Sequence, residues 1–417
     1  MRICLLSYRC YRYSGGQGIY VRYLSRSLRE LGHDVEIISG PPYPELDDGV
    51  KLIKLPGLDL YSLPERERFL TNIRTFKSLP NFTEWLGVCA GFFTEPLTFG
   101  MRAYSFLCNN NRYKQYDVIH DNQSLSHGIL KIRGLGIPVV TTIHHPITID
   151  RDLAIKAAES FWQEMGIRRW YSFANMQLKV AKRLSHFITG SHNSYHQIID
   201  IFKLPKGSLR VIYDGVDNTV FTQIPGVRRL ENRLLVINSG DTPLKGLKYL
   251  LEAVATLQQS EQRIELVIIG KQMKNGYTQG LIDSLGIADR VTHLGQVNTA
   301  ELVRHYSMAT MVVVPSVYEG FGLPAAEAMC CGTPVISTTA GALPEIIGDA
   351  GILVPPADAM ALVEAITSLI NNPQRRRHLS EMGRRRVMDM FNWKNTAKHT
   401  ANTYKEAIEY QNSLKAQ

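Results

Sequence analysis

The chain has 417 residues and a formal net charge of +9, and 44% of its residues are hydrophobic. That length exceeds what one hydrophobic core usually supports, so we expect two domains. No apolar run approaches the length of a transmembrane helix, and the six cysteines show neither zinc-ligand spacing nor the density of a disulfide scaffold.

The apolar stretch at residues 3–7 is too short for a signal peptide, so we expect the protein in the cytosol. The basic charge suits phosphorylated ligands or an anionic membrane surface, which makes peripheral attachment at the inner face of the membrane a second expected location. No motif supports binding to nucleic acid.

A strand–helix–strand unit opens the chain. The apolar residues 2–7 predict a buried strand, a helical pattern follows through residues 21–31, and residues 35–38 predict the next strand. Gly15 and Gly16 stand in the first strand-to-helix turn, where glycine lets the backbone approach a phosphate. The loop lacks the spacing of a dinucleotide fingerprint, so by itself it is a weak signal.

Residues 56–115 mix aromatic and basic side chains with poor periodicity, and we expect helices there. Two interpretations stay open for this segment. It is either an ordinary insertion with buried aromatics, or a surface that faces an acceptor or a membrane.

Regular alternation returns with predicted strands at residues 117–120 and 139–144. His144 ends the second of these strands, and ligands bind at the carboxyl ends of strands in open α/β sheets. A long helical stretch is expected over about residues 153–184, followed by a strand at residues 186–191.

The second half repeats the pattern. Strands are predicted at residues 234–238, 266–270, 291–295 and 312–314, and Lys245 with Gly246 opens a helix after the first of them. A last helix is expected from residue 393 to 414. Alternating strands and helices in both halves predict two doubly wound parallel sheets.

The most informative stretch follows residues 312–314. A Gly-rich loop leads into a helix that has Pro324 in its first turn, so free N–H groups and the helix dipole form an anion site. Glu319 on the loop and Glu327 in the helix bracket this site, eight positions apart. Carboxylates at such spacing are common by chance, and a surface loop with two solvated acids is the alternative.

The full string E-G-F-G-L-P-x-x-E-A-M-x-x-G-T-P-V-I, from Glu319 to Ile336, resembles the E-x7-E segment of retaining GT-B glycosyltransferases of family four. The resemblance implies the GT-B fold, with two Rossmann-like domains. We expect an acceptor-side domain at residues 1–205, a nucleotide-sugar domain at 206–392, and the helix 393–414 crossing back to the first domain.

The resemblance also implies roles for site residues. Glu319 would hold hydroxyls of the donor sugar, Glu327 the ribose, and His144 would orient the sugar rather than attack it. The positive groups expected at the donor diphosphate are Lys245, the loop glycines Gly15 and Gly16, and the backbone N–H groups of Gly320, Phe321, Gly322 and Leu323. Lys245, Glu319 and His144 are the expected catalytic residues.

Family members commonly carry an arginine several residues before the lysine, but residues 234–244 contain none. Arg9 or Arg12 would have to substitute, or the donor is held more weakly. His145 likewise stands where the family has Asp. The expected reaction is retaining, with the leaving phosphate taking the acceptor's proton, and it needs neither a metal ion nor another cofactor.

The expected partners are a UDP-, GDP- or ADP-linked hexose and a sugar, lipid-linked or small-molecule acceptor. The sequence does not decide between bases, sugars or acceptors. Two other functions stay open: a nucleotide-sugar-binding protein that has lost transfer, and a GT-B epimerase that acts on the nucleotide sugar alone.

Overall fold

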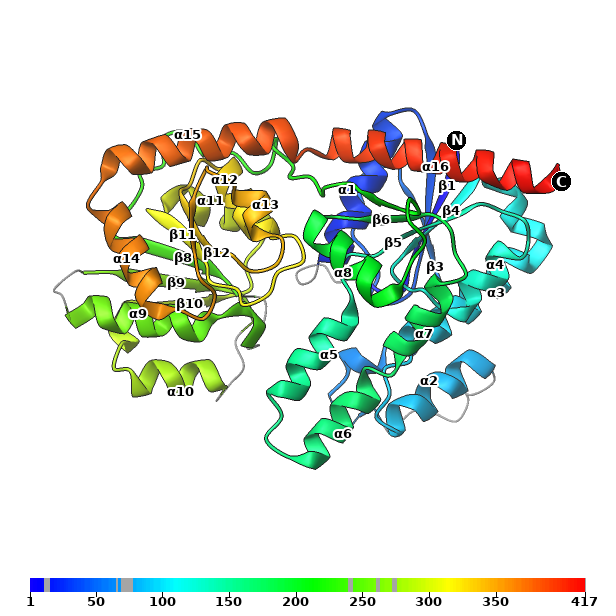
Figure 1. Cartoon of the computed structure of the whole chain (residues 1–417), viewed down its shortest axis with the longest axis horizontal. Helices are drawn as coiled ribbons and strands as arrows, with labels where there is room; N and C mark the ends of the chain where they lie inside the picture. Colours follow the sequence, from blue (N-terminus) through cyan, green and yellow to red (C-terminus); the bar gives the residue numbers. More distant parts are fainter. Residues whose placement is uncertain are drawn as a thin grey trace. The chain divides into compact units, whose positions relative to one another are not determined.

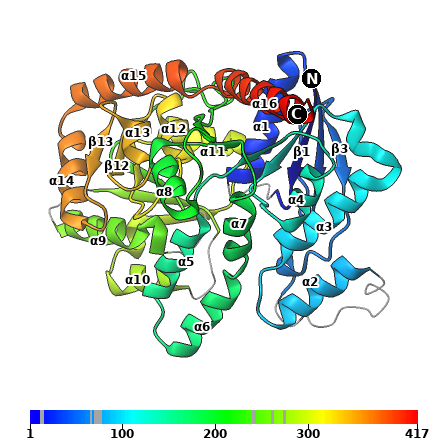
Figure 2. The ribbon, with the colours of Figure 1, turned by 45° about the vertical axis from the view of Figure 1, so that its right-hand side comes forward.

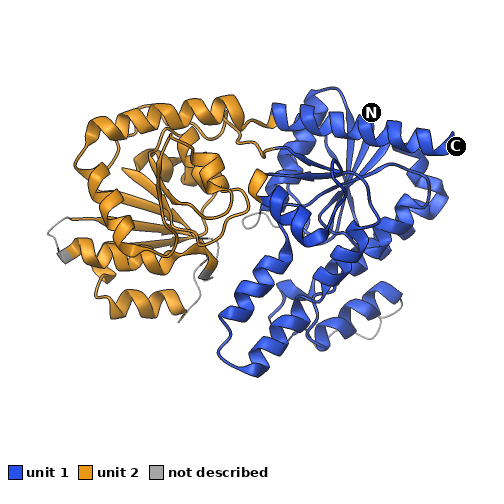
Figure 3. Cartoon of the chain, in the orientation of Figure 1, with its two compact units in different colours: residues 1–190, 194–212, 394–417 blue, residues 191–193, 213–393 orange. Residues whose placement is uncertain are grey.

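The computed structural model describes residues 1–10, 16–64, 67–68, 78–238, 243–259, 263–271 and 276–416. These residues form two compact units (Figure 3): unit 1 holds residues 1–190, 194–212 and 394–417, and unit 2 holds residues 191–193 and 213–393. The main division therefore falls after residue 212, a few residues beyond the position expected from the sequence.

Unit 1 contains a seven-stranded parallel sheet with the order β3-β2-β1-β4-β5-β6-β7 (Figure 1). Its strands are β1 (Arg2–Ser7), β2 (Asp34–Ser39), β3 (Lys51–Lys54), β4 (Val118–Asn122), β5 (Val139–Thr142), β6 (Phe187–Thr189) and β7 (Leu209–Val211). Because β1 pairs with both β2 and β4, the chain reverses its winding direction at β1. Ligands of open α/β sheets bind beside such a switch point, at the carboxyl ends of the strands.

Some helices of unit 1 pack on this sheet, while others extend away from it (Figure 2). The helices are α1 (Gly16–Glu30), α2 (Leu79–Cys89), α3 (Glu95–Cys108), α4 (His127–Arg133), α5 (Ile147–Lys156), α6 (Phe161–Trp170), α7 (Phe173–Ala181) and α8 (His192–Phe202), with the 3-10 turns η1 (Leu60–Ser62) and η3 (Asn109–Gln115). Those that extend away from the sheet are α2, α5 and α6. The helices expected within residues 56–115 are confirmed by α2 and α3.

The helical stretch expected over residues 153–184 is formed by three separate helices, α5, α6 and α7 (Figure 2). The break has a local cause: the Ser160 side chain accepts a hydrogen bond from the Gln163 N–H at 3.2 Å and starts α6 anew. An N-cap serine satisfies an N–H group that a continuous helix would bond to its own carbonyls.

Unit 2 contains a six-stranded parallel sheet with the order β10-β9-β8-β11-β12-β13. Its strands are β8 (Arg233–Ile237), β9 (Glu265–Ile269), β10 (Val291–Gly295), β11 (Met311–Val314), β12 (Val335–Thr338) and β13 (Ile352–Val354). Its helices are α9 (Leu247–Gln259), α10 (Tyr277–Ser284), α11 (Thr299–Met308), α12 (Leu323–Cys330), α13 (Leu343–Ile347), α14 (Ala359–Ile370) and α15 (Pro373–Met390), with the 3-10 turns η4 (Pro243–Lys245) and η5 (Ala288–Arg290).

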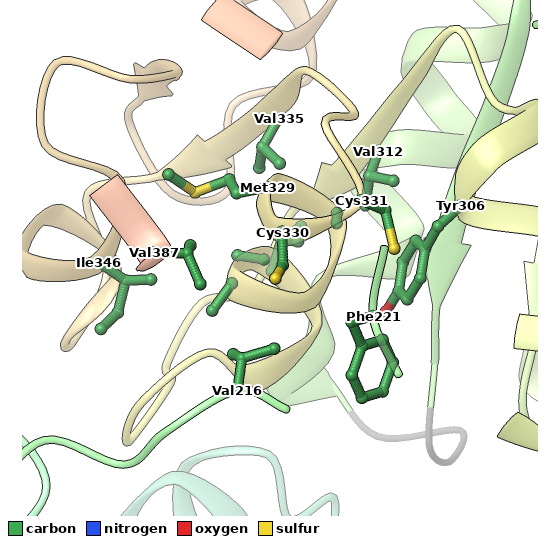
Figure 4. Packing of buried hydrophobic residues seen from close by; sticks show 14 of the residues in the cluster. Val216, Phe221, Tyr306, Val312, Met329, Cys330, Cys331, Val335, Ile346 and Val387 are labelled. Carbon is green, nitrogen blue, oxygen red and sulfur yellow. The ribbon is translucent and has the colours of Figure 1, made fainter. Parts of the chain in front are cut away.

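The core of unit 2 lies on both faces of its sheet, since alternate residues of β11 belong to different clusters. Val312 packs in the cluster that surrounds α12, whereas Met311 and Val313 pack with α9 and α14. Figure 4 shows Met329, Cys330 and Cys331 of α12 and its C-cap packed inside the first cluster. The short helix of the motif is thereby fixed on the sheet by its own apolar side.

The last helix, α16 (Trp393–Lys415), packs on unit 1, as expected from the sequence (Figure 1). Its buried residues Ala397, Ala401, Tyr404 and Ala407 recur at helical spacing. The Tyr404 hydroxyl lies 2.6 Å from Nδ1 of His120 in β4. Two parallel-sheet Rossmann-like units with a returning C-terminal helix make this the GT-B fold. Within the described residues, no helix combines the length and apolar character needed to cross a bilayer.

Candidate active site

The loop between β11 and α12 owes its shape to two glycines. Gly322 precedes α12 with φ of 105°, a conformation that side-chain-bearing residues rarely adopt. Gly341, with φ of 59°, lies so close to the loop that a Cβ atom would stand 2.1 Å from the Glu319 carbonyl oxygen. That carbonyl accepts the Ala342 N–H at 2.9 Å, so backbone contacts hold Glu319 in place.

The structure brings together two of the residues predicted to be catalytic. Lys245 Nζ lies 2.7 Å from Glu319 Oε2, although the residues are 74 positions apart. The turn of Lys245 is tied to the motif loop, because the Val317 N–H donates to the Leu244 carbonyl at 2.8 Å. Both side chains are partly exposed, Lys245 to 27% and Glu319 to 15%, so a ligand can reach them.

Beside this ion pair, α12 presents unused backbone donors. Within the described part of the chain, the N–H groups of Phe321, Gly322 and Leu323 donate to no acceptor. Pro324 occupies the first helical turn, where its missing N–H costs nothing. Free N–H groups at a helix N-terminus together with an ammonium group form an anion site.

Glu327 lies in the second turn of α12 and is buried, with 8% exposure. Its Oε2 accepts a hydrogen bond from the hydroxyl of Tyr306 at 2.9 Å, and Tyr306 is fully buried in α11 (Figure 4). Burial raises the pKa of Glu327 to about 7, while the Tyr306 hydrogen bond acts in the opposite direction. Tyr306 was not predicted from the sequence, because it stands 21 positions away from Glu327.

In unit 1, His144 follows β5 and is fixed by two neighbours from the end of β4. Its N–H donates to Gln123 Oε1 at 2.7 Å, and its Nε2 lies 2.8 Å from Asn122 Oδ1. Asn122 in turn donates from Nδ2 to Ser7 Oγ at 3.2 Å, so its Oδ1 is the acceptor. We therefore assign the ring proton of His144 to Nε2, which leaves Nδ1 as an acceptor.

The His144 ring stays neutral, because burial lowers its pKa to about 3, with a further contribution from His145. The ring meets Tyr20 of α1 edge to face, with centroids 4.9 Å apart at 85°. His145 is directed elsewhere, since its Nε2 lies 2.8 Å from Asp150 in α5.

A fully buried histidine, His120, supports the partly buried His144, and its role was not anticipated from the sequence. His120 Nε2 lies 2.7 Å from Thr142 Oγ1, and Thr142 Oγ1 lies 3.0 Å from the Tyr20 hydroxyl. Its other nitrogen meets Tyr404 of α16. Burial lowers the pKa of His120 to about 3. The C-terminal helix is thus connected by hydrogen bonds to the residues around His144.

The other predicted site residues are placed only in part. Gly16 is the exposed first residue of α1, whereas Gly15, Arg12 and residues 239–242 lie outside the described residues. Arg9 lies beside Glu95, with Nη1 3.3 Å from Glu95 Oε2. Among the described side chains, no group of three or more His, Cys, Asp or Glu could hold a metal ion.

Comparison with protein families gives two matches that together span most of the chain. The model for Glycosyltransferase Family 4 matches residues 14–220, and the model for Glycosyl transferases group 1 matches residues 222–386. The two matches meet near the division between the units.

Among curated relatives, the MMP alpha-(1->4)-mannosyltransferase of Mycolicibacterium hassiacum is 43% identical over 412 residues, which cover 98% of each chain. Two solved structures share the fold. The sucrose-phosphate synthase of Thermosynechococcus elongatus has a TM-score of 0.74 at 24% identity, covering 98% of this chain and 100% of that one. HepE of Anabaena in complex with UDP-glucose has a TM-score of 0.69 at 16% identity, covering 97% and 100%.

Proposed function

The chain belongs to the glycosyltransferase family that the family 4 and group 1 models describe, and we propose that it is a retaining mannosyltransferase with a sugar acceptor. The mannosyl group would come from a nucleotide sugar, and no metal ion would be needed. The observation that carries the proposal is the Lys245–Glu319 ion pair beside the free N–H groups of α12.

Breaking the anomeric bond leaves negative charge on the leaving phosphate, and the site must meet that charge with positive groups already in place. Lys245 and the N–H groups of residues 321–323 supply such groups without a metal ion. In this proposal, the diphosphate takes Lys245 from Glu319 when the donor binds. Glu319 then accepts hydrogen bonds from hydroxyls of the donor sugar.

Glu327 is proposed to hold the ribose. A carboxylate accepts hydrogen bonds from both hydroxyls of a vicinal diol, and the Tyr306 hydroxyl occupies only Oε2. Glu327 would repel a phosphate whenever it is ionised, so the diphosphate and ribose roles belong to different parts of the loop and helix.

His144 is proposed to orient the transferred sugar. Its Nε2 is engaged with Asn122, and its neutral ring presents Nδ1 as an acceptor for a sugar hydroxyl. In the retaining reaction that we propose, the acceptor oxygen attacks on the same face from which the phosphate leaves. The leaving phosphate takes the acceptor's proton, so no protein nucleophile is required.

Mannose is our choice of donor sugar because the relative at 43% identity is called a mannosyltransferase. The same name favours a saccharide acceptor over a lipid. The nucleotide of the donor is UDP, GDP or ADP. HepE, which shares the fold, is described in complex with UDP-glucose. We also propose that the protein is cytosolic and can contact an anionic membrane at its surface, because its net charge is +9.

The test is a panel of UDP-, GDP- and ADP-linked hexoses with mannosides of one to four units, assayed after exhaustive EDTA treatment. We expect one mannosyl donor to give an elongated mannoside at full rate in EDTA. Activity that is lost in EDTA and restored by Mg²⁺ or Mn²⁺ would contradict the metal-independent reaction. Donor isomerisation without acceptor would identify an epimerase, and donor binding without turnover would identify a binding protein.

A further inference from the structure

A small pocket lies in unit 1 at the carboxyl ends of β1, β2 and β3, and its lining includes none of Lys245, Glu319, Glu327 and His144. It is lined by Tyr8, Gly40, Leu55, Glu84, Glu95 and Arg102, among others. Its free volume is about 10 Å³, which is room for one water-sized group. A single hydroxyl group fits such a space, whereas a whole sugar ring does not.

Two buried carboxylates line this pocket, and their surroundings differ. Glu84 is 2% exposed, and its oxygens accept hydrogen bonds from the Leu58 N–H at 3.2 Å and from Arg102 Nη2 at 2.5 Å. These contacts tie α2 to α3 and to the loop after β3. Glu84 is therefore satisfied by the fold itself.

Glu95 is 6% exposed, yet neither of its oxygens accepts a hydrogen bond from any described residue. Arg9 Nη1 lies 3.3 Å away and supplies charge, but not a hydrogen bond of good geometry. Burial raises the pKa of Glu95 to about 8. A buried carboxyl group without a donor costs free energy, and a hydroxyl entering the pocket would remove that cost.

Hydrogen bonds connect the pocket to His144 within the same unit. His144 contacts Asn122, Asn122 donates to Ser7, and the Ser7 hydroxyl donates to the Arg9 carbonyl at 3.4 Å. Arg9 carries the guanidinium group that faces Glu95. The pocket and His144 thus share the carboxyl ends of one sheet, where ligands of such sheets bind.

The charges around the pocket exclude a phosphate as its occupant. Its lining includes three acidic residues, Asp59, Glu84 and Glu95, against Arg102, with Arg9 beside them. Even with Glu95 protonated, no excess of positive charge remains. Aromatic rings form the neighbouring wall, with Tyr8 and Phe93 centroids 6.4 Å apart. A neutral polyhydroxylated molecule meets these conditions.

We propose that Glu95, held by Arg9, accepts a hydrogen bond from a hydroxyl group of a neutral sugar acceptor. The proposal rests on the proposed glycosyl transfer, because it places the acceptor at the sheet that also presents His144. The sugar residue of the acceptor that enters this pocket would carry no phosphate group. Glu95 would then select the acceptor without any part in donor binding.

The experiment measures binding without donor, by saturation-transfer NMR and calorimetry, with methyl α-mannosides of one to four units as probes. The measurement is made at pH 9, where Glu95 with its pKa of about 8 is ionised. Glu95→Gln should then weaken mannoside binding about 10-fold, because a neutral acceptor replaces a charged one. Glu95→Asp should recover part of it. The matched control is Glu84→Gln, which should lower the Tm but keep acceptor affinity within about twofold of the native value.

In turnover assays, Glu95→Gln should raise the acceptor KM by a similar factor while donor KM and nucleotide affinity stay unchanged. Unchanged mannoside binding by Glu95→Gln would overturn the assignment, and so would tighter binding of mannose 6-phosphate than of the neutral mannosides. If the native protein binds mannosides through Glu95 but transfers nothing, the proposed transfer fails while this site stands.

Discussion

Lys245 and Glu319 form an ion pair of 2.7 Å, and we propose that the donor diphosphate replaces Glu319 as the partner of Lys245. We predict that Lys245→Ala lowers kcat by about 10²–10³-fold, and more than it raises KM, because the charge that it meets grows in the transition state. Steady-state kinetics over donor concentration provide the measurement. Lys245→Arg should recover only part of the activity.

Lys248 provides the matched control for this prediction. It lies three residues further on, in α9, and pairs with Glu252 at 3.8 Å. Lys248→Ala should leave kcat near its native value. Near-normal turnover of Lys245→Ala, combined with a loss of kcat and of donor affinity in Arg9→Ala or Arg12→Ala, would show that the principal cation comes from the N-terminal segment instead. A rise in acceptor KM alone in Arg9→Ala would reflect its contact with Glu95.

If Glu327 holds the ribose, as proposed, nucleotide binding should depend on pH. Its pKa is raised to about 7, and ribose hydroxyls donate best to the ionised carboxylate. Affinity for the free nucleotide should therefore rise as pH increases through 7 and level off above it. Glu327→Gln should remove this part of the profile, and Glu327→Ala should cost about 1–3 kcal/mol of binding at pH 8.

Calorimetry measures the pH profile of nucleotide affinity for the native protein and for Glu327→Gln. The titration of the nucleotide's phosphate contributes equally to both profiles, so their difference reports Glu327 alone. Tyr306→Phe removes the hydrogen bond that favours the ionised form, so its profile should move to higher pH. Identical profiles for all three proteins would remove Glu327 from the ribose role.

At the scale of elements, α16 and β4 share the buried His120–Tyr404 contact. The folded protein holds His120 neutral with a pKa of about 3, whereas the unfolded chain protonates it near 6.5. The unfolded state thus binds more protons between these values. The contribution of His120 to the free energy of unfolding should be fully present above pH 6.5. It should be lost as the pH drops toward 3, which lowers the free energy of unfolding by up to about 4 kcal/mol.

His120→Gln should be less stable at pH 7 but should lose less stability between pH 7 and pH 4. Chemical denaturation at several pH values, followed by a signal from unit 1, measures both quantities. His144 titrates in the same direction, so the variant should flatten the slope without abolishing it. An unchanged slope would show that another group controls the acid transition.

Most elements were predictable from the sequence because their signals are local. The strand predicted at residues 312–314 is β11, and Pro324 correctly marked the first turn of α12. The break between α5 and α6 was missed, since one capping serine is a weak signal within a helical pattern. Continuous periodicity outweighs a single cap when a sequence is read alone.

The candidate site was predictable in its motif residues but not in their partners. Tyr306 reaches Glu327 only because α11 packs against α12 in the folded unit. Asn122 reaches His144 because β4 pairs with β5 in parallel, so their ends meet. Such contacts depend on packing and register, and no spacing in the sequence reports them.

At the scale of the whole molecule, a nucleotide that binds only the folded state must raise its Tm. Among UDP, GDP and ADP, we predict that one gives a clear shift, equivalent to about 2.7 kcal/mol at a concentration of 100 Kd. Lys245→Ala should reduce the shift, whereas Lys248→Ala should not. Equal shifts for all three nucleotides would indicate that the site does not read the base.

The anomeric configuration of the first product shows whether the transfer of mannose is retaining. Native protein in EDTA is mixed with the α-linked nucleotide mannose and a methyl α-mannoside, and the anomeric proton of the product is followed by NMR from the first turnovers. Because a retaining transfer keeps the α configuration of the donor, we predict an elongated mannoside with an α linkage from the earliest time point. A β-linked product, or an unchanged acceptor while the donor stays bound, would contradict it.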